Sequence, residues 1–182
     1  MTTKNKIRHK LNSYEEILDN FNRVRVNNAN SSKYSARSVL KTRLEIDKLL
    51  ENNDSAELYA RFGNLEEEFK KEIDSDFVKI VKEELDASLE IFESAIDHFL
   101  ELDPVANELA NDLDIRDSIE VLSLFLLEQE EYDYRDEIKE LDERFRDKYR
   151  ANSNKIREFK QAVSKNYLGD NFWWRHPEKV NN

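Results

Sequence analysis

Residues 58–73, LYARFGNLEEEFKKEI, carry the spacing that decides the fold of this chain. Apolar side chains recur at steps of four, three, four and four residues, at Leu58, Phe62, Leu65, Phe69 and Ile73. This spacing places them on one face of an α-helix, in the manner of a coiled-coil seam. Gly63 weakens such a helix by about 1 kcal/mol relative to alanine, so we expect it at a close helix crossing or a bend.

The same apolar spacing continues beyond residue 76, which extends the helical prediction through the middle of the chain. Its members are Phe77, Val81, Leu85, Leu89, Phe92, Ile96, Phe99 and Leu102. Between the two stretches stands Asp74-Ser75-Asp76, for which two interpretations stay open. These residues either cap a new helix or form the exposed face of one long helix.

Helix-capping signals mark the beginnings of further helices on the N-terminal side. Ser13 and Glu16 have the spacing of a capping box, so we expect the first helix to begin at Ser13. A second helix is expected over residues 34–51. Asp54 and Glu57 repeat the capping signature, and they predict the start of the helix that carries the seam.

On the C-terminal side, Asp103-Pro104 predicts a helix restart, because aspartate caps a helix and proline suits its first position. We expect a short helix that ends near Leu113. Asp114 with Asp117 is then expected to cap the next helix, over residues 115–131, which holds the most apolar segment of the chain and is predicted to be central.

Two more helical stretches are expected, over about residues 138–149 and 156–167. Asn152 either separates them or, in a continuous helix, stands in the apolar stripe as a polar residue that sets the packing register. Gly169 follows as the expected C-terminal cap.

The composition supports an all-α fold. The chain has only two glycines and two prolines among 182 residues, and sheet proteins need glycine at hairpin turns. Phosphate-binding loops need several closely spaced glycines, so the sequence excludes the common nucleotide-binding motifs. We therefore predict an irregular antiparallel bundle of about seven or eight helices with long helical hairpins.

The predicted domain organisation has three parts. Residues 1–12 are expected to form a basic flexible arm, residues 13–169 the helical bundle, and residues 170–182 an aromatic tail. The longest apolar run, Val121–Leu127, is far shorter than the ~20 residues of a membrane span. Residues 1–10 hold no apolar core of a secretory signal, and there is no cysteine for disulfides, so we expect a cytoplasmic protein without membrane partners.

The least ordinary stretch is the tail sequence Phe172-Trp173-Trp174-Arg175-His176-Pro177. One interpretation is that its aromatic residues fold back and close one end of the bundle. The other is that they bind a partner, because tryptophan and arginine are favoured interface anchors. We favour the first interpretation, since exposed aromatic patches are rare on monomers. The candidate partner-binding residues are Phe172, Trp173, Trp174 and Arg175.

A second candidate site is basic. The formal net charge is −11, yet residues 1–50 carry +6 and residues 151–182 carry +3, whereas the middle is acidic. Candidate nucleic-acid-binding residues are Arg144, Arg146, Lys148, Arg150, Lys155, Arg157 and Lys160. Such residues attract phosphate backbones, and Trp173 or Trp174 could stack on bases. We favour internal charge complementarity instead, because nucleic-acid-binding domains are usually basic overall.

Neither a metal site nor a cofactor is predicted. Asp112, Asp114 and Asp117 lack the glycine and the terminal glutamate of a calcium loop, and helix capping accounts for the last two. The three histidines are scattered, and none follows a glutamate at the spacing of a bundle di-iron site. His176 beside Arg175 is the only candidate for hydrolytic chemistry, and it stands in a tail rather than a pocket.

These observations favour a non-enzymatic protein–protein interaction or regulatory module that binds a protein partner or a second copy of itself. The alternative is a nucleic-acid-binding protein that uses its basic N- and C-terminal segments. An enzyme ranks third, because no catalytic group of residues stands out in the sequence.

Overall fold

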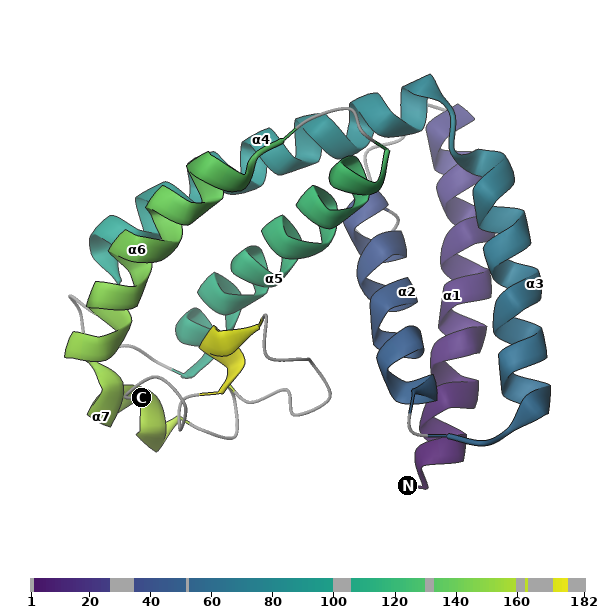
Figure 1. Cartoon of the computed structure of the whole chain (residues 1–182), viewed down its shortest axis with the longest axis horizontal. Helices are drawn as coiled ribbons and strands as arrows, with labels where there is room; N and C mark the ends of the chain where they lie inside the picture. The colour runs from purple at the N-terminus through teal and green to yellow at the C-terminus, as the bar shows by residue number, and fades with distance from the viewer. Residues whose placement is uncertain are drawn as a thin grey trace. The chain divides into compact units, whose positions relative to one another are not determined.

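A computed structural model shows seven α-helices, one 3-10 turn and no strand within the described residues, so the all-α prediction is confirmed (Figure 1). Of residues 22–26 and 106–108 only the backbone is described. The described residues are 2–26, 35–51, 53–99, 106–129, 133–159, 163 and 172–176. The chain divides into two compact units, Met1–Glu84 and Leu85–Asn182, and their boundary falls inside helix α4 (Ser75–His98).

The N-terminal unit contains α1 (Thr3–Val26), α2 (Ala36–Leu50), α3 (Ala56–Glu72) and the first turns of α4. Helix α1 packs against both α2 and α3. Along the chain the three helices run up, down and up, so that α1 and α3 are parallel (Figure 1). Short connections favour this arrangement, because each apolar stripe finds a neighbouring stripe without a long crossover.

Ion pairs fix the register of α1 against α3. Arg8 lies 3.2 Å from Glu57, and Glu15, two turns further along α1, lies 2.6 Å from Arg61, one turn further along α3. Deeper in the unit, the Tyr14 hydroxyl donates to Glu66 at 3.1 Å. Burial and the Glu66 charge raise the pKa of this phenol well above its ordinary value. Helices α1 and α3 are thus joined by buried apolar contacts and by polar contacts along the edge of the same interface.

The prediction that the first helix begins at Ser13 is wrong, and so is the flexible arm over residues 1–12. Helix α1 begins at Thr3. Ile7 and Leu11 are fully buried and extend the apolar stripe of Tyr14 backward by two turns. The capping-box match at Ser13 is local, whereas burial of two further apolar side chains stabilises the earlier start by a few kcal/mol.

Three other predictions in this unit concern the start of α3, the start of α4 and the role of Gly63. Helix α3 begins at Ala56 with Ser55 at the N-cap position, not at Asp54. Asp74 accepts a hydrogen bond from the Phe77 backbone N–H at 2.8 Å, so it caps a new helix, which is one of the two interpretations left open. Gly63 is exposed and a side chain there would meet open space, so no close helix crossing explains it.

Glu84 supplies a cap for α2 from a different helix. Its two carboxylate oxygens accept hydrogen bonds from the backbone N–H groups of Ala36 and Arg37, each at 2.9 Å. Ser35 adds a third cap by accepting from Ser38 N–H at 3.2 Å. Burial raises the pKa of Glu84, while the two backbone donors act in the opposite direction. The N-terminus of α2 is therefore closed by tertiary contact as well as by its own sequence.

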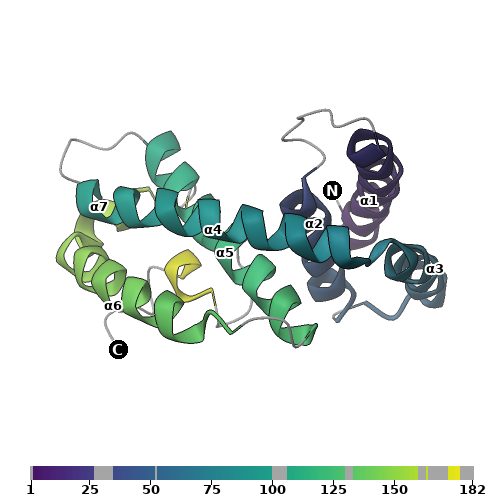
Figure 2. The same ribbon diagram turned by 90° about the horizontal axis from the view of Figure 1, so that it is seen from above.

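The C-terminal unit contains the rest of α4 with α5 (Ala106–Glu128), α6 (Arg135–Ala151), α7 (Ser153–Glu158) and the 3-10 turn η2 (Trp173–Arg175). Helices α4 and α6 run side by side (Figures 1 and 2). Their contacts advance in parallel, from Asp86 with Tyr134 to Asp97 with Arg144. The core of this unit is aromatic around Phe92, Phe99 and Phe145.

Two positions at which the sequence suggests a helix break, Asp114 and Asn152, differ in the structure. Helix α5 continues without interruption through Asp114 and Asp117, so the expected break and the capping role of these residues are wrong. Asn152 does break the helical run, with α6 ending before it and α7 beginning after it. The reason for the first error lies in the tertiary contacts of the two aspartates, described below.

Several predictions fall outside the described residues: the helix restart at Asp103-Pro104, the cap at Gly169 and the basic residue Lys160. Among the helices that are described, none combines the length and the apolar character that a membrane crossing requires.

Candidate functional site

Residues 172–176 form a compact turn inside the C-terminal unit. The backbone N–H of Arg175 donates to the Phe172 carbonyl at 2.8 Å, and that of His176 donates to the Trp173 carbonyl at 3.0 Å. Four of the five side chains are buried, and Trp173 is the half-buried exception. The turn therefore closes on its own backbone and presents its side chains to the surrounding helices.

Arg175 is held by the two aspartates of α5. Its Nε and one Nη atom donate to the two carboxylate oxygens of Asp117 at 2.9 and 2.8 Å. The same Nη atom contacts Asp114, one turn earlier on the same face of the helix, and the other Nη atom donates to the Val163 carbonyl at 3.3 Å. Arg175 is 0% exposed, so this is a fully desolvated, bidentate ion pair.

Trp174 binds the same Asp117 carboxylate. Its indole N–H donates to Asp117 at 2.9 Å, and the Tyr149 hydroxyl donates to the Trp174 backbone carbonyl at 2.8 Å. The guanidinium of Arg116 lies over the indole ring, 4.1 Å from its centroid, which is a cation–π contact. The indole is thus fixed at its N–H, at its face and at the backbone.

Arg116 is itself held by acids from two helices. It makes a bidentate contact with Asp142 of α6 at 2.7 and 2.8 Å. Its second Nη atom lies 3.0 Å from Glu120, which is close enough for an ion pair. Burial lowers the pKa of Arg116, but the two carboxylates more than offset this, so the net pKa is raised. Arg116 therefore stays charged beneath the tryptophan.

Trp173 lies at the edge of the aromatic core. Its ring centroid is 5.5 Å from that of Phe145 and 5.6 Å from that of Tyr149. The Arg146 guanidinium lies 4.4 Å from the ring centroid. One face of Trp173 is therefore already occupied by an arginine.

The placement of the tail residues matches the interpretation in which they fold back onto the bundle. Phe172, Trp174 and Arg175 are buried within their own unit, and only Trp173 keeps substantial exposed surface. Stacking of Trp174 on a base is incompatible with this burial. A role of these four residues in binding another protein stays a prediction.

A groove of about 620 Å³ lies between α5 and α6. Its apolar floor includes Leu124 and Leu127, which are 38% and 43% exposed, and the half-buried Ile138. Arg135 on its rim contacts Asp133 at 2.8 and 3.0 Å and lowers the pKa of that carboxyl to about 2. Its inner end is lined by Arg116, the residue that supports Trp174.

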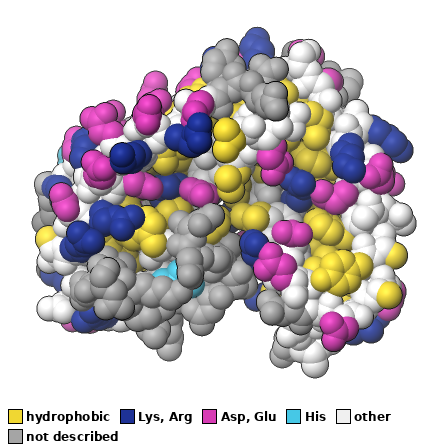
Figure 3. Space-filling view, in the orientation of Figure 1, with side chains coloured by type: hydrophobic (Ala, Val, Ile, Leu, Met, Phe, Trp, Pro, Cys, Tyr) yellow, Lys and Arg dark blue, Asp and Glu magenta, His cyan; other side chains and the backbone are white. Residues whose placement is uncertain are grey.

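The predicted basic residues do not act as one surface. Arg144 is bound to Glu93 and Asp97 of α4, at 2.8 and 2.9 Å, and Lys148 donates to the Asp97 carbonyl at 3.4 Å. These contacts are the internal charge complementarity that the sequence favours. Over the visible face of the molecule, both signs of charge are interspersed (Figure 3).

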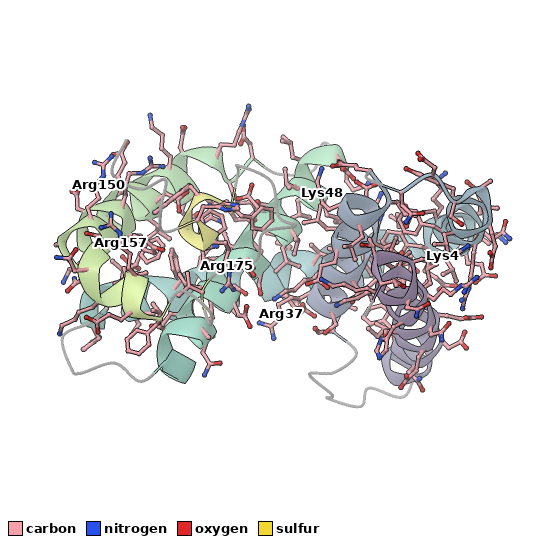
Figure 4. The ribbon with its side chains drawn as sticks, turned by 90° about the horizontal axis from the view of Figure 1, so that it is seen from below. Lys4, Arg37, Lys48, Arg150, Arg157 and Arg175 are labelled. Carbon is pink, nitrogen blue, oxygen red and sulfur yellow. The ribbon has the colours of Figure 1, made fainter. Side chains whose placement is uncertain are left out.

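Three of the predicted arginines are exposed on α6 and α7: Arg146, Arg150 and Arg157. Figure 4 shows Arg150 and Arg157 near the junction of α6 and α7, whereas Arg175 lies among the helices. Lys155 is also exposed. The cationic surface is thus smaller than the sequence set suggests.

No group of acidic residues, histidines or cysteines within the described part of the chain has the geometry of a metal site. His9 and His98 are exposed, and the His98 ring contacts the Ser94 carbonyl at 3.0 Å. His176 is buried.

Comparison with protein-family models, curated proteins and solved structures finds no match to this chain. Sequence reasoning missed Asp114 and Asp117 as acceptors for Arg175 and Arg116 as a support for Trp174. The available signal was the spacing of the two acids, since positions 114 and 117 stand one turn apart on the same face of a helix.

Proposed function

We propose that this chain is a non-enzymatic, cytoplasmic protein–protein interaction module that binds its partner in the groove between α5 and α6. The observation that carries the proposal is the exposure of Leu124 and Leu127 on the floor of that groove. Their neighbours on the same helix, Leu122 and Leu126, are fully buried. Residues 121–127 of α5 are apolar except for Ser123, and a helical segment that is apolar on all sides is normally covered on all sides. Here one side of the segment is left open.

The shape of the groove favours a helical segment as the bound element. Two antiparallel helices leave a channel into which a third helix packs its ridge of side chains. Leu124 and Leu127 stand one turn apart, so a partner helix with apolar residues at the same spacing can contact both. A second copy of this chain is one such partner.

Nucleic-acid binding is less well supported. Arg144 and Lys148 are directed to acids and a carbonyl of α4, and Trp174 has no exposed surface for stacking. Arg146, Arg150, Lys155 and Arg157 remain as exposed cations on a strongly acidic chain. Four cations can support only weak, salt-sensitive binding to a phosphate backbone.

The proposal is tested with a groove variant and a matched control. Leu124→Glu combined with Leu127→Glu places charge on the groove floor, whereas Ile91→Glu places it at an exposed apolar position on α4. Both are made in the full chain, cross-linked to bound proteins in native extract and compared by quantitative mass spectrometry. We expect one set of proteins to be retained by the wild type and the Ile91 variant and lost from the groove variant.

Sedimentation of the purified chain tests self-association through the same surface. Retention of the same proteins by all three chains would show that the groove is not the binding site. A strictly monomeric chain that retains no protein, yet binds an oligonucleotide at low salt, would favour the nucleic-acid alternative. Circular dichroism of each variant establishes that the helices are intact.

A further inference from the structure

We propose that α5 and α6 form a recognition site for a Trp-Arg turn, occupied here by residues 172–176, and that a partner segment with the same two side chains can take their place. The site lies beyond the groove of the proposed function, although Arg116 and Arg146 contribute to both. Its test needs no knowledge of the partner that binds the groove.

The receptor side is built by helices rather than by the turn. Asp114 and Asp117 stand within the continuous helix α5. Arg116 is held in place by Asp142 and Glu120, neither of which belongs to the turn. Tyr149 packs its ring against Phe145 and Phe99 of the core. The two carboxylates of α5, the Arg116 guanidinium and the Tyr149 hydroxyl are therefore held in place by the helices and not by the segment that they bind.

The ligand side is a short, self-closed element. Two backbone hydrogen bonds within residues 172–176 form the turn, so a pentapeptide contains every group that the turn presents. The contacts that it makes with α5 and α6 are directional: an indole N–H, a guanidinium and one backbone carbonyl. A set of this kind reads particular side chains rather than apolar area alone.

The chemistry of the site selects tryptophan followed by arginine. Asp117 is 1% exposed with the turn in place, so a segment that covers its carboxylate in this way must bring a positive partner. The two parallel hydrogen bonds to it require the planar guanidinium, which lysine lacks. Phenylalanine in place of Trp174 leaves out the N–H that Asp117 accepts.

Occupation in cis limits access by other segments. A tethered segment has an effective concentration on the order of millimolar, so a free peptide of equal intrinsic affinity competes poorly with it. Weakening the resident segment should therefore open the site. This sets the direction of the test, because the emptied chain must bind better than the wild type.

The test uses the full chain with Trp174→Ala and Arg175→Ala, which removes both anchors. The probe is the capped pentapeptide Phe-Trp-Trp-Arg-His, titrated by calorimetry and by chemical-shift changes. We expect the emptied chain to bind it at least about tenfold more tightly than the wild type does, as expected from removal of a millimolar competitor. Lysine in place of the peptide arginine, or Asp117→Asn added to the emptied chain, should abolish this gain.

Folding is monitored in the same experiment. If the emptied chain has lost its helical signal, the peptide should restore it or raise the melting temperature, because a ligand of the folded state stabilises that state. The milder full-chain variant Arg175→Lys provides a second folded receptor. Equal binding to the wild type, the emptied chain and the Asp117→Asn form, or no effect of millimolar peptide on any of them, overturns the proposal.

Discussion

Arg175 and Asp117 form a bidentate ion pair inside the C-terminal unit, at 2.9 and 2.8 Å, although 58 residues separate them in the sequence. Arg175 is 0% and Asp117 1% exposed. Two charges removed from water in this way are tolerated only because each completes the hydrogen bonds of the other. The middle of α5 and the end of the described chain are thereby tied together.

Replacement of Asp117 by asparagine should destabilise the C-terminal unit. The change removes the buried, bidentate carboxylate and leaves Arg175 with only the half-exposed Asp114, and it should cost about 3–5 kcal/mol of unfolding free energy, the range for breaking a buried pair. Urea unfolding followed by circular dichroism measures the difference. Asp114→Asn is the matched control, and we expect a smaller loss because the Asp114 side chain is 49% exposed. Equal effects of the two variants would contradict the assigned geometry.

Tryptophan fluorescence should resolve the two halves of the turn, because Trp173 and Trp174 are the only tryptophans of the chain. A Trp173→Phe variant retains the fully buried Trp174, so we expect blue-shifted emission that is protected from acrylamide. A Trp174→Phe variant retains the half-buried Trp173 and should show redder, more quenchable emission. Strong quenching in the Trp173→Phe variant would mean that the turn is not seated on α5.

Glu84 should make stability depend on pH in the N-terminal unit. Burial raises its pKa above the ordinary 4.5, so the folded state holds the proton more tightly than the unfolded state. Its contribution is therefore complete below pH 4.5 and is lost as the pH rises through the folded-state pKa. Urea unfolding over this pH window should show that loss in the wild type and not in Glu84→Gln. The exposed Glu83→Gln serves as control, and an unchanged pH profile in Glu84→Gln would argue against the burial of this carboxyl.

Replacement of Gly63 by alanine should stabilise α3. The position is exposed and helical, and an added methyl group meets nothing within 4 Å. Alanine restricts the unfolded chain and favours the helix, which predicts a gain of about 0.5–1 kcal/mol. Thermal unfolding compared with the wild type measures the gain. Destabilisation would instead mean that the added methyl group meets another surface, which is the close helix crossing expected from the sequence.

Much of the helical layout could be predicted from periodicity. The seam of Leu58, Leu65 and Phe69 is buried in α3, and the stripe from Phe77 continues through α4. Boundaries were less predictable. Ser13 has the residue type of a cap, but its backbone N–H belongs to a helix that begins at Thr3. An N-cap hydrogen bond contributes about 1 kcal/mol, which is less than the burial of the apolar side chains up to two turns upstream contributes.

The candidate site was predicted only in part. Composition and position singled out the tail as unusual, and folding back onto the bundle was the favoured interpretation. The residues that receive it were not identified, because Asp114 and Asp117 also fit local helix capping. Capping is a contact within four residues, whereas the contact with Arg175 spans about sixty, and single-sequence spacing carries information only about the former.

The sequence by itself determined the all-α class, because two glycines cannot supply the turns of a sheet protein and the apolar residues repeat at helical intervals. It also determined which faces of α3 and α4 are apolar. The tertiary structure alone decided which acids serve as caps and which serve as partners: Glu84 closes α2 from another helix, and Asp117 binds Arg175 within the core. The physical reason is that helix periodicity is a property of neighbouring residues, whereas the pairing of buried charges depends on which distant segments share one interior.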